Sequence, residues 1–398
     1  MLHPHRIASD AEAIDVAADL AVRFSEEAGQ RDRERRLPFA EIGLLKESGL
    51  LGVTVPHELG GPDVSTVTLA EIFRLLAEAD PSIGQVPHSH FVFLEAVRLQ
   101  GTHQQRARFF GEAQAGRLFA NAQSERNSRT IAEDQTTLGA VGDGYVLEGE
   151  KFYATGSLFA DWLVVRATNS DSPADARTKS LAFLPAETAG VDIVDDWDGL
   201  GQRTTGSGTV RLRAVKVSAD QVMPYTAIFG EPTVYGSRAQ LLHAALDAGI
   251  ARAALEEVVL QTQRARPWFE SGVDQAIDDP LLIQQAGELE ILIRSAEALI
   301  AEAGLAIDTA RAKPDDDNTA QASVATAAAK VVAARAAVDV SAALFEFGGS
   351  RSAAAGLNLD RHWRDGRTHT LHDPTRWKVH HLGRWTLHGT PPPRHGLL

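Results

Sequence analysis

The chain has 398 residues, too many for a single hydrophobic core, so two or three domains are expected. Hydrophobic residues make up 44% of it and charged residues 23%, a composition that excludes wholesale disorder. The formal net charge is −14, from 39 basic against 53 acidic residues, and no concentrated basic patch stands out. Nucleic acid and anionic membrane surfaces are therefore not expected partners.

The sequence contains no cysteine. This excludes disulfides, cysteine-ligated zinc, iron–sulfur clusters and thiol nucleophiles. The first residues have no apolar segment typical of a secretory signal, and no apolar run approaches the ~20 residues needed to cross a bilayer. We therefore expect a cytoplasmic protein.

The first third of the chain is predicted to be helical, because apolar residues recur through it at helical spacing. Proline in a first turn and glycine after a last turn mark helix ends, and Ser65 or Thr66 supplies a cap. The helices are expected over residues 11–29, 38–48, 66–79 and 82–115. We assign residues 1–117 to an N-terminal helical domain.

The middle of the chain, residues 118–230, is predicted to be a β-barrel-like domain. Short alternating segments such as YVLEGEKFY and GTVRLRAVKV are separated there by turn signals, a pattern typical of strands. The pair Asp143-Gly144 between two such segments is a strong hairpin signal.

Residues 231–398 are predicted to form a C-terminal four-helix bundle. Long helices are expected over 237–266, 281–311 and 319–347, and the alanine-rich third permits close approach of its neighbours. Long antiparallel helices joined by short loops describe a bundle, which the segment after Asp373 completes. The expected fold class is α+β, with helical, β and helical-bundle domains in that order.

Five segments with candidate functional residues follow one another along the chain. They are FANAQSE at 119–125, KFYATGS at 151–157, GLGQRTTGS at 199–207, FGGS at 347–350 and WRD at 363–365. In this order they resemble five motifs of the acyl-CoA dehydrogenase superfamily: the Thr-Glu-Pro strand, the Trp-Ile-Thr-Asn segment, the Met-Gly-x-Arg-x-Ser segment, the Gly-Gly loop and the Arg-Asp pair. Each motif alone is a weak signal, and five in collinear order are a strong one.

Within that superfamily the chain resembles in particular the sulfur-acquisition oxidoreductases and dibenzothiophene monooxygenases. ADPSIGQ, LNLDRHWRDGRTHTLHDP and the terminal GTPPPRHGLL carry this resemblance. Such relatives take reduced FMN from a separate flavin reductase and insert oxygen from O₂ at sulfur. The resemblance thus implies a two-component monooxygenase that acts on a small organosulfur substrate through a flavin C4a-hydroperoxide. It also implies a homotetramer with flavin sites shared between subunits.

The resemblance points to a substitution at the reactive position. Acyl-CoA dehydrogenases carry a catalytic glutamate shortly after the Arg-Asp pair, and here the matching stretch TLHDP places His372 there. In the monooxygenase relatives this histidine faces the flavin C4a position. His372, Asn121 and His90 are the residues expected to hydrogen-bond the peroxide without deprotonating it. His88 lies two residues from His90, so the register leaves either as the third partner. The alternative for His372 is a structural histidine at a helix start.

Flavin contacts are expected from the β domain. Ser124, Thr155 and Ser157 are candidates for hydrogen bonds to the flavin ring, and Tyr153 takes the place of a tryptophan that covers the ring in relatives. The alternative for the three hydroxyl residues is that they are surface positions of alternating strands.

The flavin phosphate is expected to meet cations or backbone N–H groups. Arg266, in the segment RPWF, matches an arginine of the dehydrogenases that reaches the neighbouring subunit's cofactor. Gly348 and Gly349 permit close approach of backbone to a phosphate. The alternatives are a cation at a helix C-terminus for Arg266 and a simple helix stop for the glycines. These residues do not distinguish FMN from FAD.

Other kinds of site are less well supported. No Glu-x-x-His motif of a di-iron bundle is present at the bundle glutamates, so no metal site is expected. No dinucleotide-binding fingerprint follows a predicted strand. An FAD-dependent acyl-CoA dehydrogenase stays an alternative, disfavoured by the missing glutamate. A non-catalytic binding protein that retains only the fold is a further alternative, and the presence of Ser124, Thr155 and Arg266 argues against it.

Overall fold

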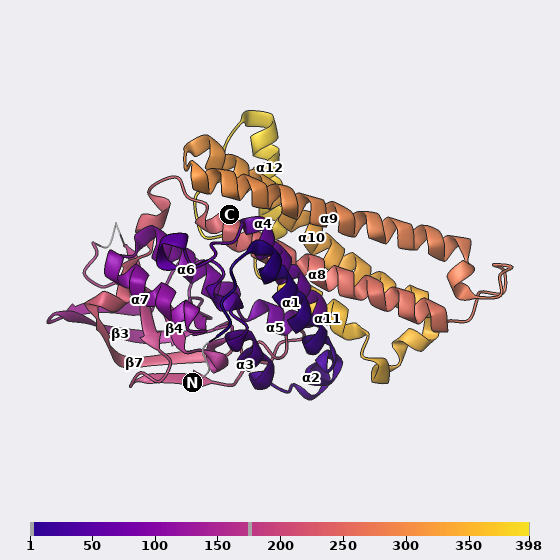
Figure 1. Cartoon of the computed structure of the whole chain (residues 1–398), viewed down its shortest axis with the longest axis horizontal. Helices are drawn as coiled ribbons and strands as arrows, with labels where there is room; N and C mark the ends of the chain where they lie inside the picture. The colour runs from indigo at the N-terminus through magenta and orange to yellow at the C-terminus, as the bar shows by residue number, and fades with distance from the viewer. Residues whose placement is uncertain (1–3, 174–176, 398) are drawn as a thin grey trace.

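The computed structural model describes residues 4–173 and 177–397. A helical segment comes first along the chain, then a β-sheet, then a group of long helices (Figure 1). The first helices are α1 (Asp10–Ser25), α2 (Ala28–Glu34), α3 (Phe39–Glu47), α4 (Thr66–Ala79), α5 (Pro81–Gln85), α6 (His88–Gln100) and α7 (His103–Gln114). This order is the one that the sequence predicts.

The helix expected over 82–115 is three helices in the structure. Pro87 precedes α6 and cannot donate a backbone hydrogen bond, so the chain turns there. Gly101 ends α6, and Thr102 starts α7 with a capping box shared with Gln105. The cap predicted for α4 is confirmed, since the Ser65 side chain accepts from the Thr68 N–H.

The described strands form one curled sheet. They are β1 (Phe119–Ala122), β2 (Thr137–Val141), β3 (Gly144–Lys151), β4 (Trp162–Asn169), β5 (Lys179–Pro185), β6 (Val191–Val194), β7 (Thr209–Ser218) and β8 (Val222–Pro224). Their order is β6-β7-β3-β2-β4-β5-β8, with β1 added parallel to β4. The predicted hairpin joins β2 to β3, but its two turn residues are Gly142 and Asp143, because Val141 pairs with Gly144. Gly142 takes a left-handed φ of 63°, which glycine adopts without strain.

Helices α6 and α7 cover one face of this sheet. Their phenylalanines pack with Phe119, Trp162 and Phe183 of the strands in one apolar cluster. The opposite face carries a second cluster of valines, leucines and alanines. Strand β4 is therefore buried along almost its whole length, as expected for a strand covered on both sides.

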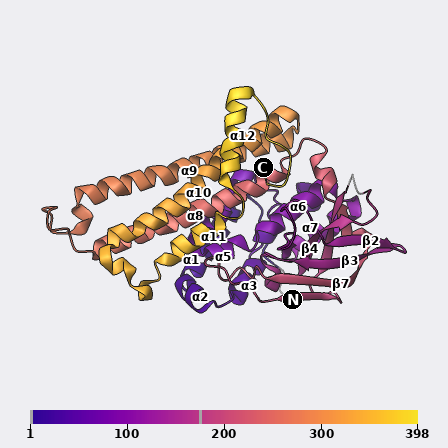
Figure 2. The same ribbon diagram turned by 180° about the vertical axis from the view of Figure 1, so that it is seen from behind.

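The long helices lie at the other end of the molecule from the sheet (Figure 2). They are α8 (Tyr235–Arg264), α9 (Pro280–Ala312) and α10 (Asp316–Gly348), followed by the shorter α11 (Asp360–His369) and α12 (Thr375–His388). The three long helices confirm the ranges predicted for them to within a few residues. Helix α10 packs between α8 and α9 through its alanines, and α12 packs on α10. Helix α4 also packs along α8, a contact that local sequence patterns did not indicate.

The N-terminal helices are thus joined to the bundle through α4 and α8, and to the sheet through α6 and β1. The loop from Trp197 to Ser207 and the turn between α11 and α12 both approach this junction. Among the described residues, no helix is both long enough and apolar enough to span a bilayer.

Candidate active site

A cavity of about 760 Å³ lies where the sheet, the N-terminal helices and the bundle meet. This volume is in the range typical of cofactor and small-molecule sites. Its sheet side is lined by Asn121, Ser124, Phe152, Tyr153 and Thr155, and its loop side by Trp197, Gly199, Leu200, Thr205 and Ser207. Its helical side is lined by Gln85, His88, His243, Arg367, His369 and His372.

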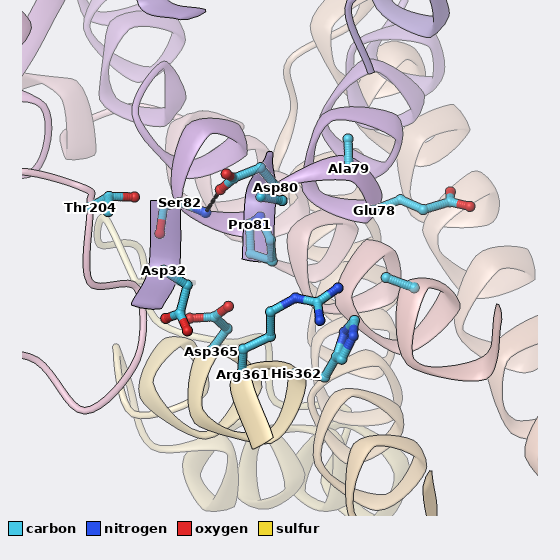
Figure 3. Close-up of a pocket in the computed structure, with 12 residues that line it drawn as sticks. Asp32, Glu78, Ala79, Asp80, Pro81, Ser82, Thr204, Arg361, His362 and Asp365 are labelled. Carbon is cyan, nitrogen blue, oxygen red and sulfur yellow. Dashed lines mark hydrogen bonds between the residues drawn. The ribbon is translucent and has the colours of Figure 1, made fainter. Parts of the chain in front are cut away.

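A second cavity, close by, is far smaller. Figure 3 shows Asp80 and Ser82 at one side of it and Asp365 with its α11 neighbours at the other. Its volume of about 20 Å³ has room for a single water molecule. The larger cavity is therefore the candidate site for a cofactor and substrate.

Several predicted flavin contacts meet at the larger cavity. Asn121, on β1, donates from Nδ2 to the Tyr153 carbonyl at 3.1 Å. Tyr153 has a left-handed φ of 56°, an uncommon conformation for a residue with a bulky side chain, and its side chain is half exposed. Such a backbone conformation is often found at functional sites, where surrounding contacts hold it.

Two motifs lie side by side at this wall. The Thr155 hydroxyl lies 2.9 Å from that of Ser207, which in turn lies 2.7 Å from that of Thr205. The Gly156 N–H donates to the Thr205 carbonyl at 2.9 Å. The segments 151–157 and 199–207 thus form one continuous surface of hydroxyl groups, and Ser124 adds another.

Ser157 and His90 do not line the cavity. Ser157 is buried and donates to the Gly206 carbonyl at 3.3 Å. His90 is fully buried between the Leu51 carbonyl, 2.7 Å from Nε2, and the Phe119 N–H, 3.3 Å from Nδ1. Burial lowers its pKa to about 4, so it is a neutral core histidine with both ring nitrogens satisfied.

His88, rather than His90, lies at the cavity. Two residues along an α-helix rotate a side chain by roughly 200°, so only one of the pair can face a given side. The Nε2 of His88 bonds the Ala239 carbonyl at 2.9 Å, and its ring lines the cavity. Of the two histidines that the sequence left open, His88 is thus the one that lines the cavity.

Arg266, Gly348 and Gly349 lie at the far end of the bundle. Arg266 follows the end of α8, whose residue His243 lines the cavity, and 21 residues of helix span roughly 30 Å. Gly348, at the end of α10, approaches the last turns of α8. These three residues therefore do not reach the cavity of their own chain.

His372 lies in the turn between α11 and α12 and is partly exposed to the cavity. Its Nδ1 is 3.0 Å from the Asp373 carboxylate, which also pairs with Lys378. Burial alone would raise the pKa of Asp373, but the hydrogen bond from His372 and the nearby lysines lower it. A carboxylate only accepts, so His372 carries its proton at Nδ1, and its Nε2 is an acceptor when the ring is neutral.

His243 and His369 complete a group of four histidines. The ring of His243 lies against the rings of His88 and His372, with centroids 3.9 Å and 4.1 Å apart; the first pair is stacked and the second is tilted by 37°. Its Nδ1 is 3.0 Å from Nε2 of His369. Burial lowers the pKa of His88 to about 3 and that of His243 well below its usual value. Local patterns could not single out His243, because it lies in the middle of α8 with nothing nearby to mark it.

No metal centre is formed by these histidines. In residues 4–173 and 177–397, no group of three or more His, Cys, Asp or Glu side chains is placed to hold an ion. The stacked geometry of the rings explains this, since a metal requires ring nitrogens that converge on one point.

The loop that forms one cavity wall is fixed to α11. The Gln202 N–H donates to a carboxyl oxygen of Asp365 at 2.6 Å, and the Gly201 N–H donates to the Thr368 hydroxyl at 2.9 Å. A Cβ at Gly201 would lie 2.1 Å from the Arg364 carbonyl oxygen, so only glycine permits this approach. Helix α11 therefore positions both the histidine turn and the loop opposite it.

Comparison with known proteins identifies the family. Family models for the N-terminal, middle and C-terminal domains of acyl-CoA dehydrogenases match residues 11–117, 120–215 and 241–377. The chain belongs to the acyl-CoA dehydrogenase family. The family and fold class expected from the sequence are confirmed.

Several of the similar proteins are named monooxygenases. The chain is 33% identical to the dibenzothiophene monooxygenase of Rhodococcus qingshengii, over 97% of this chain and 96% of the relative. It is 32% identical to a probable FMNH2-dependent monooxygenase, SfnC, of Pseudomonas putida, over 96% of each. The crystal structure of FMN-bound TdsC from Paenibacillus sp. A11-2 superposes with a TM-score of 0.91 at 33% identity, covering 97% of this chain and all of that one.

Proposed function

We propose that this protein is a two-component, flavin-dependent monooxygenase that inserts oxygen at the sulfur of a small organosulfur compound. The observation that carries the proposal is that an imidazole, His372, lines the cavity, at the position that the sequence resemblance matches to the catalytic glutamate of the dehydrogenases. The relatives that are 32–33% identical over nearly the whole chain bear monooxygenase names, and one of them is named a probable FMNH2-dependent monooxygenase. The cofactor is FMN, which we expect a separate reductase to supply in reduced form.

The cavity residues fit a flavin. Two lining amide oxygens, Gln85 Oε1 and Gln202 Oε1, are buried and have no hydrogen-bond partner among the described residues. Ser124, Tyr153 and Thr155 would hold the ring, which needs hydrogen bonds along its polar edge. Reduced FMN, when bound here, supplies the electrons with which one atom of O₂ enters the substrate and the other leaves as water.

The two walls of the cavity offer the groups that this reaction needs. His372 holds a proton at Nδ1 and offers Nε2 for proton exchange with a reacting oxygen. Asn121 offers an amide from the opposite wall, and His88 offers its Nδ1, because its Nε2 proton is held by the Ala239 carbonyl. The neutral ring nitrogens accept a hydrogen bond from a protonated oxygen and the amide donates one, so these groups can hold a reactive oxygen without removing its proton.

Part of the cavity lining is apolar. Ile131, Leu200 and Leu371 line it and are more than half exposed. Such surface excludes water from the reacting atoms once a substrate covers it. It supports a small organosulfur compound with an apolar body.

The test is oxygen use by the His372→Ala protein, supplied with FMN, a flavin reductase, NAD(P)H and candidate sulfides or sulfones. We expect flavin to bind within about threefold of the unaltered affinity, while product per O₂ falls roughly 100-fold and H₂O₂ is released instead. The matched control is His103→Ala, an exposed histidine at the start of α7. Full coupling in His372→Ala would contradict the role of His372. Failure of the unaltered protein to bind flavin, or anaerobic bleaching of bound flavin by acyl-CoA, would overturn the function itself.

We also infer a homotetramer in which each cavity is completed by a neighbouring subunit. Large apolar side chains are exposed along α9 and in the loop before it, at Trp268, Phe269, Leu281 and Ile291. Exposed apolar surface of this extent marks an interaction face. Arg266 lies beside it, so an adjacent subunit would bring this cation, with Gly348 and Gly349, towards a flavin phosphate. The cytoplasmic location stays a prediction.

A further inference from the structure

A buried ion pair lies behind the four cavity histidines. Asp247 on α8 and Lys330 on α10 are both fully buried, with 2.8 Å between Oδ2 and Nζ. The other carboxylate oxygen of Asp247 is 2.5 Å from Nδ1 of His369. Burial alone would raise the pKa of Asp247, but Lys330 and His369 hold it below its usual value. Asp247 is therefore a carboxylate, and it can only accept from His369.

The carboxylate of Asp247 determines which ring nitrogens of His369 and His243 carry protons. Because His369 donates from Nδ1 and burial lowers its pKa, its neutral ring has a lone pair at Nε2. His243 must then donate from Nδ1 to that lone pair across 3.0 Å. The neutral His243 ring is left with an acceptor at Nε2. The carboxylate of Asp247, which does not itself line the cavity, thus sets the tautomers of two lining histidines in sequence.

The charges behind the rings balance in pairs. The carboxylates of Asp247 and Asp373 pair with the ammonium groups of Lys330 and Lys378 behind the rings, and the guanidinium of Arg367 also lines the cavity. The charges within the two ion pairs cancel, so a proton on any of the rings adds a positive charge that they do not offset. Rings about 4 Å apart repel each other when both are cationic, so one proton at a time is favoured.

We propose that Asp247, with Lys330 as its counter-ion, is a positioning residue that keeps His243 neutral and fixed in one tautomer, so that His372 alone holds the exchangeable proton of the cavity. The inference rests on the proposed function. His88 and His243 are buried and hard to protonate, while His372 is partly exposed and bonded to a carboxylate. The ion pair acts through His369 and His243 and touches neither flavin nor substrate.

The first test needs no catalysis. Neutron diffraction from crystals of the unliganded protein locates deuterium on each ring nitrogen. We expect deuterium on Nδ1 of His369 and of His243, with Nε2 of both unoccupied. Deuterium on Nε2 of His369 or His243 would overturn the proposal whether or not the protein is a monooxygenase.

The second test separates hydrogen bonding from charge. In Asp247→Asn with Lys330→Gln, the asparagine oxygen still accepts from His369, and the glutamine oxygen can accept from the asparagine amide. In Asp247→Ala with Lys330→Met, both the acceptor and the pair are gone. We expect product per O₂ to fall about tenfold in the second double variant, with the pH profile of coupling displaced and flavin affinity within about threefold. The Asn/Gln variant should rescue most of this loss, and equal losses in the two would contradict the proposal.

A matched control comes from another buried ion pair on the same helix. Arg238 of α8 pairs with Glu95 of α6 at 2.5 Å, both side chains are 3% exposed, and neither lines the cavity. Glu95→Gln with Arg238→Gln should lower stability and leave the histidine tautomers and coupling unchanged. If this control uncouples the reaction as strongly as the Asp247→Ala pair, the effect is one of general destabilisation and the proposal fails.

Discussion

Asp365 is a buried carboxyl group without a cation on its own oxygens. Its neighbour Arg364 turns away to Asp32, at 2.6 Å, and Asp365 instead accepts the backbone N–H of Gln202. Burial raises its pKa to about 7, and the nearby carboxylates of Asp32 and Asp80 add to this. The group is therefore protonated in the folded protein at pH values where the unfolded chain has already lost the proton.

This gives a pH dependence with a defined sign. The folded-state pKa of about 7 lies above the usual 3.8, so the folded state binds the extra proton between these values and its stability falls as pH rises through them. Asp365→Asn keeps an acceptor for Gln202 and cannot ionise. We expect the variant to gain roughly 2 kcal/mol relative to the unaltered protein between pH 5 and pH 8. Urea unfolding at several pH values measures this, and parallel stability curves would contradict it.

At the residue scale, the sequence indicated several of the side chains that line the cavity but not all of them. His372, Asn121, Ser124, Tyr153 and Thr155 meet at the cavity as expected, since each lies in a motif with fixed spacing. The sequence favoured His90, but His88, two residues earlier on α6, lines the cavity. A motif match alone does not show which side of a helix a residue faces. The deeper residues could not be found, since they are brought together only by the packing of α8, α10 and α11.

At the scale of elements, the loop 199–207 and α11 form one unit. The loop carries cavity residues on one side, and its backbone N–H groups bond Asp365 and Thr368 on the other. Gln202 of the loop and Asp365 of the Arg-Asp pair are 163 residues apart in the sequence and are hydrogen-bonded in the fold. The glycine at 201 allows the close approach of loop and helix that this bond requires. Their collinear order was visible in the sequence, but their contact was not.

A side chain at the point of contact should separate the two elements. Gly201→Ala places a methyl group against the Arg364 carbonyl, so the loop must move outward. We expect a loss of roughly 1–3 kcal/mol in stability and flavin affinity lowered by about tenfold. Calorimetry and flavin fluorescence titration measure the two effects. Gly43→Ala is the control, because nothing lies within 4 Å of an added Cβ there. Equal effects of the two substitutions would contradict the claim that the contact of the loop with α11 shapes the flavin site.

The predicted helix bounds were accurate where apolar residues kept a helical spacing over many turns. The three long bundle helices were predicted nearly to their ends, because caps and loops with proline and glycine mark them. Breaks inside the N-terminal helices were missed, as at Pro87, since apolar spacing continues across the turn. The packing of α4 on α8 is a tertiary contact between distant segments, which no local pattern reveals.

At the scale of the whole molecule, the end of the bundle next to Arg266 is the surface that we propose contacts a neighbouring subunit. It lies roughly 30 Å along α8 from the histidine stack, next to exposed Trp268 and Phe269. A closed assembly would bring such a surface against another copy. If each cavity takes His372 from one subunit and Arg266 from the next, two inactive variants can complement each other in one assembly.

Mixed assemblies should recover activity that neither variant has. Arg266→Ala protein is expected to bind flavin weakly, and His372→Ala protein to be uncoupled. When the two are unfolded together and reassembled at equal amounts, about a quarter of the cavities combine an intact His372 with an intact Arg266 from a neighbour. Coupled product formation above the sum of the separate variants, at limiting flavin, is the expected result. Activity equal to that sum would mean that each cavity depends on its own chain alone.

Helix α8 links these two places within one subunit. Near its start it carries His243 and Asp247, and its end leads directly into Arg266. Each residue of an α-helix adds about 1.5 Å and turns it by about 100°. A deletion of one residue between Asp247 and Arg264 would therefore redirect the arginine to another side of the rod while the histidines stay in place. Exposed side chains of α8 can vary, but the number of residues in the helix fixes the distance and direction from the histidines to Arg266. It therefore fixes where the proposed contact with the next subunit lies.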